Sequence, residues 1–258
     1  AVFTPAERQL QAEELRDTKI AQSALGAASL GAYRVLSGFG LSPDAFAGHS
    51  YGELAALCIA GAIGEADLLA LSETRGESIL AAAGADPGTM LAVAADAGAV
   101  APIVAGCDVV IANHNSPTQC VLSGAVAAID DALARLAAAG LSSRRIPVAA
   151  AFHSPIVAGA RDALAGRLAA MPVAAPRIPV WSNVTAAPYP GDPDAVRALL
   201  ADQVGLPVRF AEEIEAMYAA GARVFVEAGP GQVLTRLVDE ILGERPHLAI
   251  ACDAGNDG

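Results

Sequence analysis

The run Gly-His-Ser-Tyr-Gly at positions 48–52 places a serine in a pattern that is typical of acyl chemistry. In a Gly-x-Ser-x-Gly elbow, the serine lies on a tight turn between a strand and a helix, and the turn presents its hydroxyl as a nucleophile. The neighbouring sequence has this arrangement, because residues 45–47 can form a short buried strand and residues 53–57 start a helix. The two glycines allow the tight turn and a close approach of helix and strand. The pattern predicts that Ser50 is a nucleophile.

A serine hydroxyl is a weak nucleophile at neutral pH and needs a base within hydrogen-bond reach, usually a histidine. The elbow turns the side chain of His49 away from the serine, His114 lies on a loop where a capping role is favoured, and His247 is typical of a surface turn. His153 follows the apolar stretch 146–152 and precedes a Ser-Pro helix start, which places it at a strand end facing a cleft. We therefore expect His153 to be the base.

The order of predicted elements indicates an α/β protein with a small inserted unit. Helical periodicity with capping signals covers most of the first third, over residues 5–24, 27–38, 53–60 and 65–83. The next elements have the order βαββαβ, at 89–95, 97–105, 109–113, 119–122, 126–139 and 143–149, which is the order of a ferredoxin-like unit. From residue 155, helices and strands alternate again, with strands at 178–184, 223–227 and 248–252. This alternation predicts a parallel sheet with helices on both faces.

Composition limits the partners and the compartment. With 258 residues, of which 54% are hydrophobic, the chain can bury a sizeable core. Its net charge of −12 and single lysine, Lys19, argue against a nucleic acid or an anionic membrane surface as the main partner. The sequence has neither a secretory signal nor an uninterrupted membrane-spanning segment, so we expect a cytoplasmic protein. Its four cysteines lack paired spacing, and neither a metal site nor a disulfide framework is indicated.

Four motifs occur in a specific order across nearly the whole chain. They are Gly-His-Ser-Tyr-Gly-Glu at 48–53, Thr-Arg-Gly at 74–76, Ala-Phe-His-Ser at 151–154 and Val-Glu-Ala-Gly-Pro-Gly at 226–231. In these motifs the sequence resembles the malonyl-CoA:acyl-carrier-protein acyltransferase family. The family fold is an α/β-hydrolase-like large subdomain with an inserted ferredoxin-like small subdomain, which agrees with the element order. We expect the large subdomain at 1–86 and 148–258 and the small one at 87–147. The run Asn-His-Asn-Ser-Pro at 113–117 is similar to acyltransferase domains of polyketide or polyunsaturated-fatty-acid synthases.

The resemblance implies a ping-pong reaction. Ser50 would take a malonyl group from malonyl-CoA while His153 accepts the serine proton and returns a proton to the leaving thiol. The phosphopantetheine thiol of an acyl carrier protein would then attack the seryl ester. The backbone N–H of Tyr51 would stabilise the oxyanion, as the elbow geometry implies. No metal or cofactor is needed besides the thioester substrate, and other domains of a multidomain synthase are expected partners.

The resemblance also assigns substrate-binding residues. Arg75 matches an arginine that binds the free malonyl carboxylate, which a planar guanidinium can hold through two parallel hydrogen bonds. Gln22 and Asn115 match polar positions of the cleft that orient the serine or the thioester, although local loop or helix-cap hydrogen bonds explain them equally well. The second ring nitrogen of His153 would bond to a main-chain carbonyl, which we place at Leu206.

One family feature is missing from the printed sequence. Family members begin with a strand that leads into a Gly-Gln-Gly segment, whose glutamine region supplies a second oxyanion N–H. No such segment precedes Phe3, so either the chain is a portion of a longer protein or the oxyanion hole lacks one donor. Loss of one donor typically costs about 10²- to 10³-fold in rate, so we expect slow turnover from this chain alone.

Two other functions remain open at this stage. The chain could be a serine esterase or thioesterase, since the elbow and the sheet are shared, or it could be a non-catalytic domain of a synthase. A missing acidic triad member and an arginine in the pocket disfavour the first alternative, because an apolar acyl pocket would avoid a buried charge. The presence of Ser50, His153 and Arg75 together disfavours the second.

The residue before the predicted base gives a test of acyl selectivity. Phe152 corresponds to the malonyl-selecting form of the family motif, in which the ring leaves no room for an α-methyl group, and serine is typical there in methylmalonyl enzymes. We expect Phe152→Ser to reduce the preference for malonyl over methylmalonyl loading by about 10- to 200-fold, the value of one excluded methyl group. Intact-mass spectrometry after mixing with both donors measures the ratio. An unchanged ratio would contradict this assignment.

Overall fold

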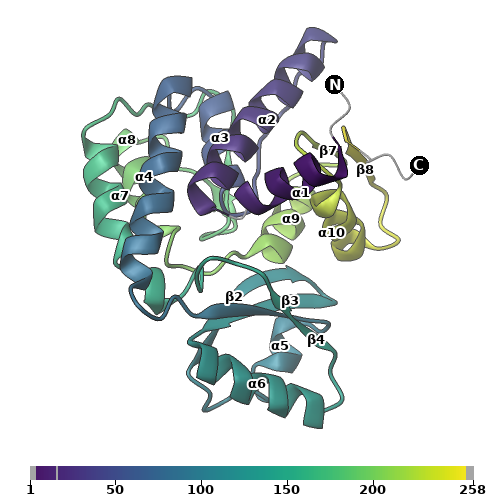
Figure 1. Cartoon of the computed structure of the whole chain (residues 1–258). Helices are drawn as coiled ribbons and strands as arrows, with labels where there is room; N and C mark the ends of the chain where they lie inside the picture. Colours follow the sequence, from purple (N-terminus) through teal and green to yellow (C-terminus); the bar gives the residue numbers. More distant parts are fainter. Residues whose placement is uncertain (1–3, 16, 254–258) are drawn as a thin grey trace.

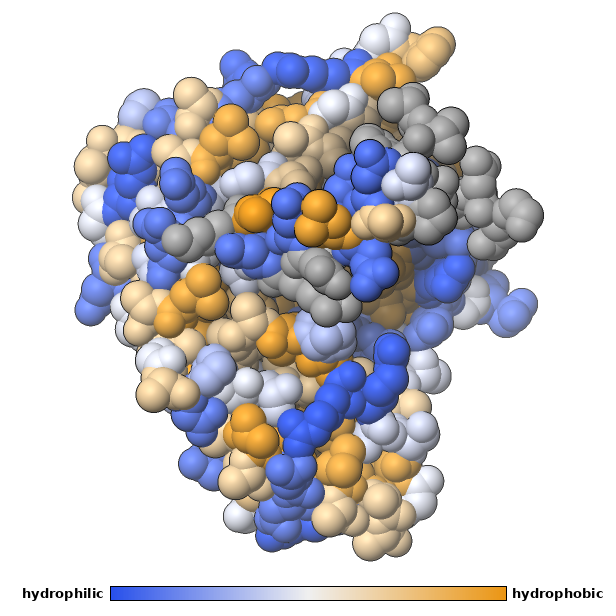
Figure 2. Space-filling model, viewed as in Figure 1, coloured by the Kyte–Doolittle hydropathy of each residue, from blue (hydrophilic) through white to orange (hydrophobic). Residues whose placement is uncertain are grey.

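The computed structural model describes residues 4–15 and 17–253, which form a mixed α/β molecule in two parts. The helices are α1 (Pro5–Glu14), α2 (Thr18–Gly38), α3 (Gly52–Ile59), α4 (Glu65–Ala83), α5 (Ala97–Val100), α6 (Val126–Ala138), α7 (Ala160–Ala169), α8 (Pro193–Asp202), α9 (Phe210–Ala219), α10 (Val233–Leu242) and the 3₁₀ turn η1 (Pro155–Val157). The strands are β1 (Thr89–Val93), β2 (Val109–Ser116), β3 (Gln119–Gly124), β4 (Ser143–Ile146), β5 (Trp181–Ser182), β6 (Ala187–Pro188), β7 (Val224–Glu227) and β8 (Leu248–Ala251). A broad body carries a narrower lobe (Figures 1 and 2).

The narrower lobe is the ferredoxin-like unit that the sequence predicts. Its four strands form an antiparallel sheet in the order β2-β3-β1-β4, and α5 and α6 cover one face of that sheet (Figure 1). The chain order β1-α5-β2-β3-α6-β4 is the split βαβ arrangement. Its strands extend from Thr89 to Ile146, while the domain division at 87–147 stays a prediction.

Alternation along β1 divides the small sheet into two faces with different roles. Leu91 and Val93 are fully buried against the helices of the lobe. Met90 belongs to a second cluster with Ala112 and Val121, which lies on the other side of the strands and contacts residues that precede His153. Successive residues of a strand point to opposite faces, so one strand serves both clusters. The second face is therefore available to line a site between the two parts of the molecule.

The parallel pairing expected in the large part is present only in short pieces. Phe46 forms a single parallel bridge with Val180, and β7 pairs with β8 in parallel. The strand predicted at 178–184 ends at Ser182, because the chain reverses there and β5 pairs antiparallel with β6. Ala186 allows this reversal, with φ of 51° and a 2.8 Å hydrogen bond from its N–H to the Ser182 carbonyl. Within the described residues, the expected parallel sheet is thus present only as these short parallel pairs.

Helix α2 corrects two predicted helix boundaries. The expected helix over 5–24 is interrupted between α1 and α2, whereas the expected break at 24–27 is absent and α2 continues through Gly26 for 21 residues. Gly26 is a packing residue: a Cβ atom there would lie 2.4 Å from the hydroxyl oxygen of Tyr51. The glycine that predicted a helix end thus serves instead to allow close packing of α2 against Tyr51 of the elbow. In the ranges 4–15 and 17–253, no helix is long and apolar enough to cross a membrane.

The small sheet is attached to the large part along β2. Val208 forms a parallel bridge with β2: its N–H donates to the Ala112 carbonyl and its carbonyl accepts from the His114 N–H, both at 2.8 Å. The His114 ring lies 3.1 Å from a carboxylate oxygen of Glu212 on α9, and Ser116 donates to Glu240 on α10 at 2.6 Å. These bonds fix the small sheet relative to the segment that precedes α9.

The contact between Gly26 and Tyr51 gives a stability prediction. Alanine is favoured over glycine inside a helix, but the new methyl group of Gly26→Ala would displace a tyrosine hydroxyl that bonds to Ser72 at 2.7 Å. We expect this change to lower the free energy of unfolding by about 1 to 2 kcal/mol, since overpacking and a lost hydrogen bond outweigh the helix propensity. Urea denaturation measures it.

Gly31→Ala is the matched control on the same helix. A Cβ at Gly31 would meet nothing within 4 Å, so the substitution should raise the free energy of unfolding by about 0.5 to 1 kcal/mol. Equal effects at both glycines would contradict the packing role of Gly26.

Candidate active site

The Gly-His-Ser-Tyr-Gly run forms a sharp turn between the Phe46 bridge and α3. Ser50 has a φ of 51°, in the left-handed region that residues with side chains rarely adopt. A Cβ at Gly48 would lie 2.1 Å from the carbonyl carbon of Gly52, so only glycine fits at this position. The strained turn presents the Ser50 side chain at the start of α3, as the elbow pattern predicts.

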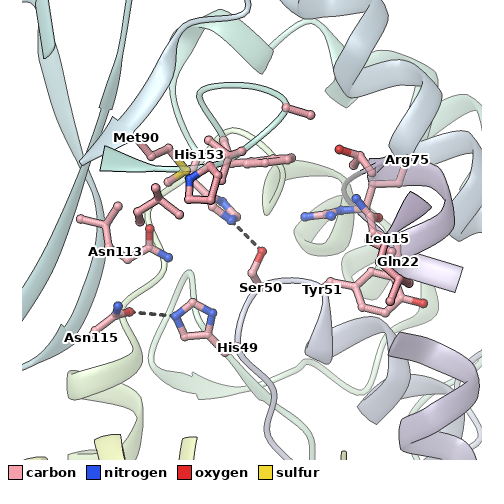
Figure 3. A pocket seen from close by; sticks show the side chains of 18 residues that line it. Leu15, Gln22, His49, Ser50, Tyr51, Arg75, Met90, Asn113, Asn115 and His153 are labelled. Carbon is pink, nitrogen blue, oxygen red and sulfur yellow. Dashed lines mark hydrogen bonds between the residues drawn. The ribbon is translucent and has the colours of Figure 1, made fainter. Parts of the chain in front are cut away.

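The Ser50 hydroxyl meets His153. The Oγ of Ser50 lies 2.7 Å from Nε2 of His153 (Figure 3). On the other side of the ring, Nδ1 of His153 lies 2.9 Å from the Leu206 carbonyl and 3.2 Å from the Gln203 carbonyl. A carbonyl oxygen can only accept, so Nδ1 carries the proton and Nε2 presents its lone pair to the serine O–H. Ser50, His153 and Leu206 thus lie together in the arrangement expected of a nucleophile, its base and the acceptor that orients the base.

The surroundings keep His153 uncharged. Its side chain is 3% exposed, and burial lowers its pKa to about 3, with the positive charge of Arg75 as the second cause. Both effects disfavour the imidazolium form. At neutral pH the ring is therefore in the form that can accept a proton from Ser50.

The other histidines have different partners. Nε2 of His49 lies 2.8 Å from Oδ1 of Asn115, and the His49 ring packs against Phe210. His114 pairs with Glu212 on α9, and Nε2 of His247 lies 3.0 Å from Asp239. Within the described ranges, His153 is the histidine that contacts the Ser50 hydroxyl.

Arg75 provides a buried positive charge beside this pair. The residue lies on α4 and is 3% exposed, and its guanidinium points toward Ser50 and His153 (Figure 3). Burial lowers its pKa to about 10, so the group stays charged at neutral pH. Its hydrogen-bond partner is Oε1 of Gln203, at 3.3 Å. Among described residues, no carboxylate lies within 4.0 Å of the guanidinium, although buried charges are usually paired. This arrangement suits an anionic ligand.

A cavity of about 420 Å³ joins these groups and lies between the two parts of the molecule. Its walls come from the elbow, from α2 and α4, from the second face of the small sheet and from the segment before His153. They include the predicted positions Gln22, Ser50, Tyr51, Arg75, Asn115, Phe152 and His153, together with Met90, Asn113 and Val121.

The predicted polar cleft residues differ in their partners. Gln22 is 5% exposed, lines the cavity, and its Oε1 has no hydrogen-bond partner among the residues described. Asn115 bonds to His49 and, through Nδ2, to Gln119 at 2.8 Å, and it makes no hydrogen bond to Ser50 in the described structure. The Tyr51 side chain is anchored on Ser72, which leaves its ring as a cavity wall. Gln22 is thus better placed than Asn115 to bond directly to a ligand.

Gln203 is a further site residue, which the motifs of the sequence do not single out. Its Nε2 donates to the Ser50 carbonyl at 2.6 Å, its Oε1 accepts from Arg75, and its main-chain carbonyl lies near Nδ1 of His153. A signal was present, since Gln203, the residue that caps the C-terminus of α8, follows the buried residues Val196 and Leu200 at helical spacing and continues their buried face. A polar residue on that face indicates a specific hydrogen-bonding task.

The structure offers little for a metal ion. In the part of the chain that it describes, no group of three or more histidine, cysteine, aspartate or glutamate side chains could hold a metal. The groups that converge on the cavity are instead a hydroxyl, an imidazole, a guanidinium and amides, which suit acyl transfer to serine.

The low pKa of His153 gives a prediction for the reactivity of Ser50. We expect the rate of Ser50 labelling by phenylmethylsulfonyl fluoride to stay level from about pH 8 to about pH 5, because the base remains neutral over this range. Intact-mass spectrometry measures the rate, and Ser50→Ala should remain unlabelled. A decline centred on the ordinary histidine pKa of 6.5 would show that His153 is not held neutral.

Comparison with known proteins agrees with this geometry. The family model described as acyl transferase domain matches residues 7–252. The chain is 37% identical over 242 residues to the malonyl CoA-acyl carrier protein transacylase of Escherichia coli K12, covering 91% of this chain and 78% of that protein. It is 34% identical over 238 residues to polyketide synthase GfsA of Streptomyces halstedii, covering 92% of this chain but only 3% of the synthase.

A solved structure shows the same fold. The acyl-carrier-protein S-malonyltransferase of Burkholderia pseudomallei superposes with a TM-score of 0.89 at 33% identity, over 94% of this chain and 80% of that one. The α/β fold with two subdomains predicted from the sequence is therefore confirmed. This chain belongs to the acyl transferase domain family.

Proposed function

We propose that this chain transfers a malonyl group from malonyl-CoA, through an ester on Ser50, to the phosphopantetheine thiol of an acyl carrier protein. The observation that carries the proposal is the position of Arg75, a buried charge without a carboxylate partner among described residues, in the same cavity as the Ser50–His153 pair. Such a cavity suits an acyl group that has a reactive carbonyl at one end and a carboxylate at the other.

In the first half-reaction, the Ser50 Oγ attacks the thioester carbonyl and its proton passes to Nε2 of His153. The tetrahedral intermediate then collapses, the carbon–sulfur bond breaks, and the proton on His153 passes to the leaving thiolate. The carbonyls of Leu206 and Gln203 hold Nδ1 throughout, so the ring keeps its direction and its tautomer. Carbonyl oxygens orient the ring without adding a buried negative charge.

The backbone N–H of Tyr51 is the donor available to the oxyanion. The Ser50 N–H is already committed to Oδ1 of Asn183 at 2.6 Å, whereas the Tyr51 N–H makes no hydrogen bond within the described residues. Tyr51 directly precedes α3, so this N–H also lies at the positive end of a helix.

Arg75 and Phe152 select the acyl group in this proposal. The guanidinium can receive the malonyl carboxylate in two parallel hydrogen bonds, and a neutral acyl group would leave the charge unpaired. Phe152 lines the cavity and packs against the cluster that contains Met90 on the second face of the small sheet. The ring is thereby held beside the base, where it excludes a branched acyl chain.

The second half-reaction returns the malonyl group to a thiol. The incoming thiol gives its proton to His153, its sulfur attacks the seryl ester, and Ser50 recovers a proton as the ester breaks. We assign the thiol to an acyl carrier protein because that is the acceptor named for the Escherichia coli relative. The chain spans only 3% of the Streptomyces synthase and 12% of a spectinabilin synthase from Streptomyces orinoci, so we propose a synthase, in polyketide or fatty-acid synthesis, as its wider setting.

Loading by defined donors tests the function. After brief incubation with malonyl-CoA, we expect the protein to gain the mass of one malonyl group. Arg75 binds the carboxylate of that donor, and the Ser50–His153 pair attacks its thioester. Ser50→Ala should show no adduct, and Arg75→Ala should lose at least about 1.5 to 3 kcal/mol of donor binding, the value of a hydrogen bond to a charged group. Intact-mass spectrometry measures the fraction of each of the three proteins that carries the malonyl adduct.

Acetyl-CoA and a no-donor sample are the controls. Acetyl loading of the unchanged protein should be weak, and Arg75→Ala should shift the ratio toward acetyl. Release of free malonate without an adduct would favour a serine esterase or thioesterase, and the absence of both products would favour a non-catalytic role.

A further inference from the structure

Asn183 lies directly beneath the elbow and contacts both of its sides. It follows β5, is fully buried, and is far from the elbow in sequence. Its Nδ2 donates to the Gly48 carbonyl at 2.7 Å, and its Oδ1 accepts from the Ser50 N–H at 2.6 Å. One amide therefore bridges the Gly48 carbonyl, which precedes Ser50, and the N–H of Ser50 itself, the residue with the strained φ angle. No other described side chain bonds to both.

The bridge bears directly on the direction of the nucleophile. Ser50 has a positive φ, which its own side chain disfavours, so neighbouring contacts must hold that conformation. The amide fixes the peptide groups on the N-terminal side of Ser50, and Nε2 of Gln203 fixes the Ser50 carbonyl on the other side at 2.6 Å. With both sides held, the Cα–Cβ bond of Ser50 has one direction, which leads to His153.

The Asn183 amide is itself held in one orientation. Its Nδ2 also donates to Oε2 of Glu213 on α9, and its backbone N–H donates to Oε1 of Glu53 at 2.8 Å. Because Nδ2 faces the Gly48 carbonyl and Oδ1 faces the Ser50 N–H, the reverse orientation of the amide would place like groups together at both backbone contacts. The Asn183 carbonyl accepts from the Arg209 N–H at 3.0 Å, which completes the anchoring.

Two buried carboxyl groups surround this asparagine. Glu53 and Glu213 are fully buried, and Glu53 also accepts from the Tyr189 hydroxyl. Burial raises the pKa of Glu213 well above its usual value, with the neighbouring Glu53 as the second cause. Burial therefore disfavours the charged form of Glu213, whose Oε2 accepts the hydrogen bond from Asn183. Apolar residues would fill the space at lower cost, so this polar cluster indicates a specific task rather than stability alone.

We propose that Asn183 is a positioning residue that directs the Ser50 hydroxyl toward His153, and that Glu213 on α9 fixes the Asn183 amide for this task. The inference rests on the proposed function only in using malonyl loading as one of its measurements. The residue touches no substrate atom and acts through the backbone of the elbow.

Exchanging the donor and the acceptor at the contact between Asn183 and Glu213 tests this inference. Asn183→Asp retains an acceptor for the Ser50 N–H but places oxygen against both the Gly48 carbonyl and Glu213. We expect malonyl loading at saturating donor to slow by about 10²-fold, the effect of a small misplacement of a reacting group. Adding Glu213→Gln supplies a new donor to the introduced carboxyl group at the lost contact, and the double variant should regain about tenfold of that rate.

A second set of measurements separates positioning from simple loss of structure. The donor concentration for half-maximal loading should stay unchanged, because Arg75 is untouched, and labelling by phenylmethylsulfonyl fluoride should slow in parallel with loading. A purely structural role would lower the unfolding midpoint and the fraction of active molecules without changing the rate per active site. Glu215→Gln, the matched change at an exposed glutamate of α9 that contacts Arg245 instead of Asn183, should load at the rate of the unchanged protein.

The possible outcomes are distinct. Failure of the unchanged protein to load malonyl, with normal labelling by the sulfonyl fluoride, would reject the proposed function and leave the positioning role to be decided by the labelling rates. Equal rates in Asn183→Asp and the unchanged protein would overturn the positioning role, as would folded single and double variants that are equally slow. If neither Asn183 variant folds, Glu213→Leu removes one acceptor of the amide and decides the question: slowing of about tenfold supports the role, and an unchanged labelling rate rejects it.

Discussion

The hydrogen bond between Ser50 and His153 is the constraint on which the rest of the structure depends, because both of its residues have an unfavourable backbone conformation. Their φ angles are 51° and 55°. Ala186, at 51°, is the third residue with a side chain and a positive φ among those described, and its turn returns the chain immediately after Asn183. The strained positions thus collect around one site. The surrounding packing and hydrogen bonds hold these conformations, which keeps Oγ of Ser50 within hydrogen-bond distance of Nε2 of His153.

Burial and charge act together on the same pair. Burial and, as the second cause, the nearby charge of Arg75 lower the pKa of His153, which keeps its ring neutral but also makes it a weak base. A carboxylate bound to Arg75 would cancel much of that positive charge and raise the pKa of His153, while burial, the larger cause, would continue to lower it. In the proposed function, binding of an anionic acyl group at Arg75 would thus act on the base that activates Ser50. Gln203 connects Arg75, His153 and Ser50 through hydrogen bonds.

The two-part architecture places the cavity walls on independent elements. The elbow supplies Ser50, α2 supplies Gln22 and α4 supplies Arg75, whereas the second face of the small sheet supplies Met90 and Asn113. The short segment before α9 joins the two parts: its carbonyls orient His153, and Val208 pairs with β2 two residues after Leu206. Any movement of the small lobe must therefore also act on the segment that orients the base.

Local sequence determined the elbow, the ferredoxin-like unit and the amphipathic helices. These features depend on spacing within a few residues, such as the two glycines around Ser50 or the alternation of Met90 and Leu91 along β1. The helix through Gly26 and the early end of β5 were mispredicted because a contact with Tyr51 and a chain reversal, both tertiary features, decided them.

The residues of the site also fall into those that sequence motifs indicate and those that only the tertiary structure reveals. Ser50, His153 and Arg75 could be named from motifs, because each lies in a short run of residues whose order and spacing are specific. Only the tertiary structure decided that Gln203 and Asn183 hold the elbow from its two sides, that Asn115 bonds to His49, and that Arg75 has no acidic partner among the described residues. Amide side chains carry no charge and form hydrogen bonds almost anywhere, so their partners depend on which distant backbone groups the fold brings within about 3 Å.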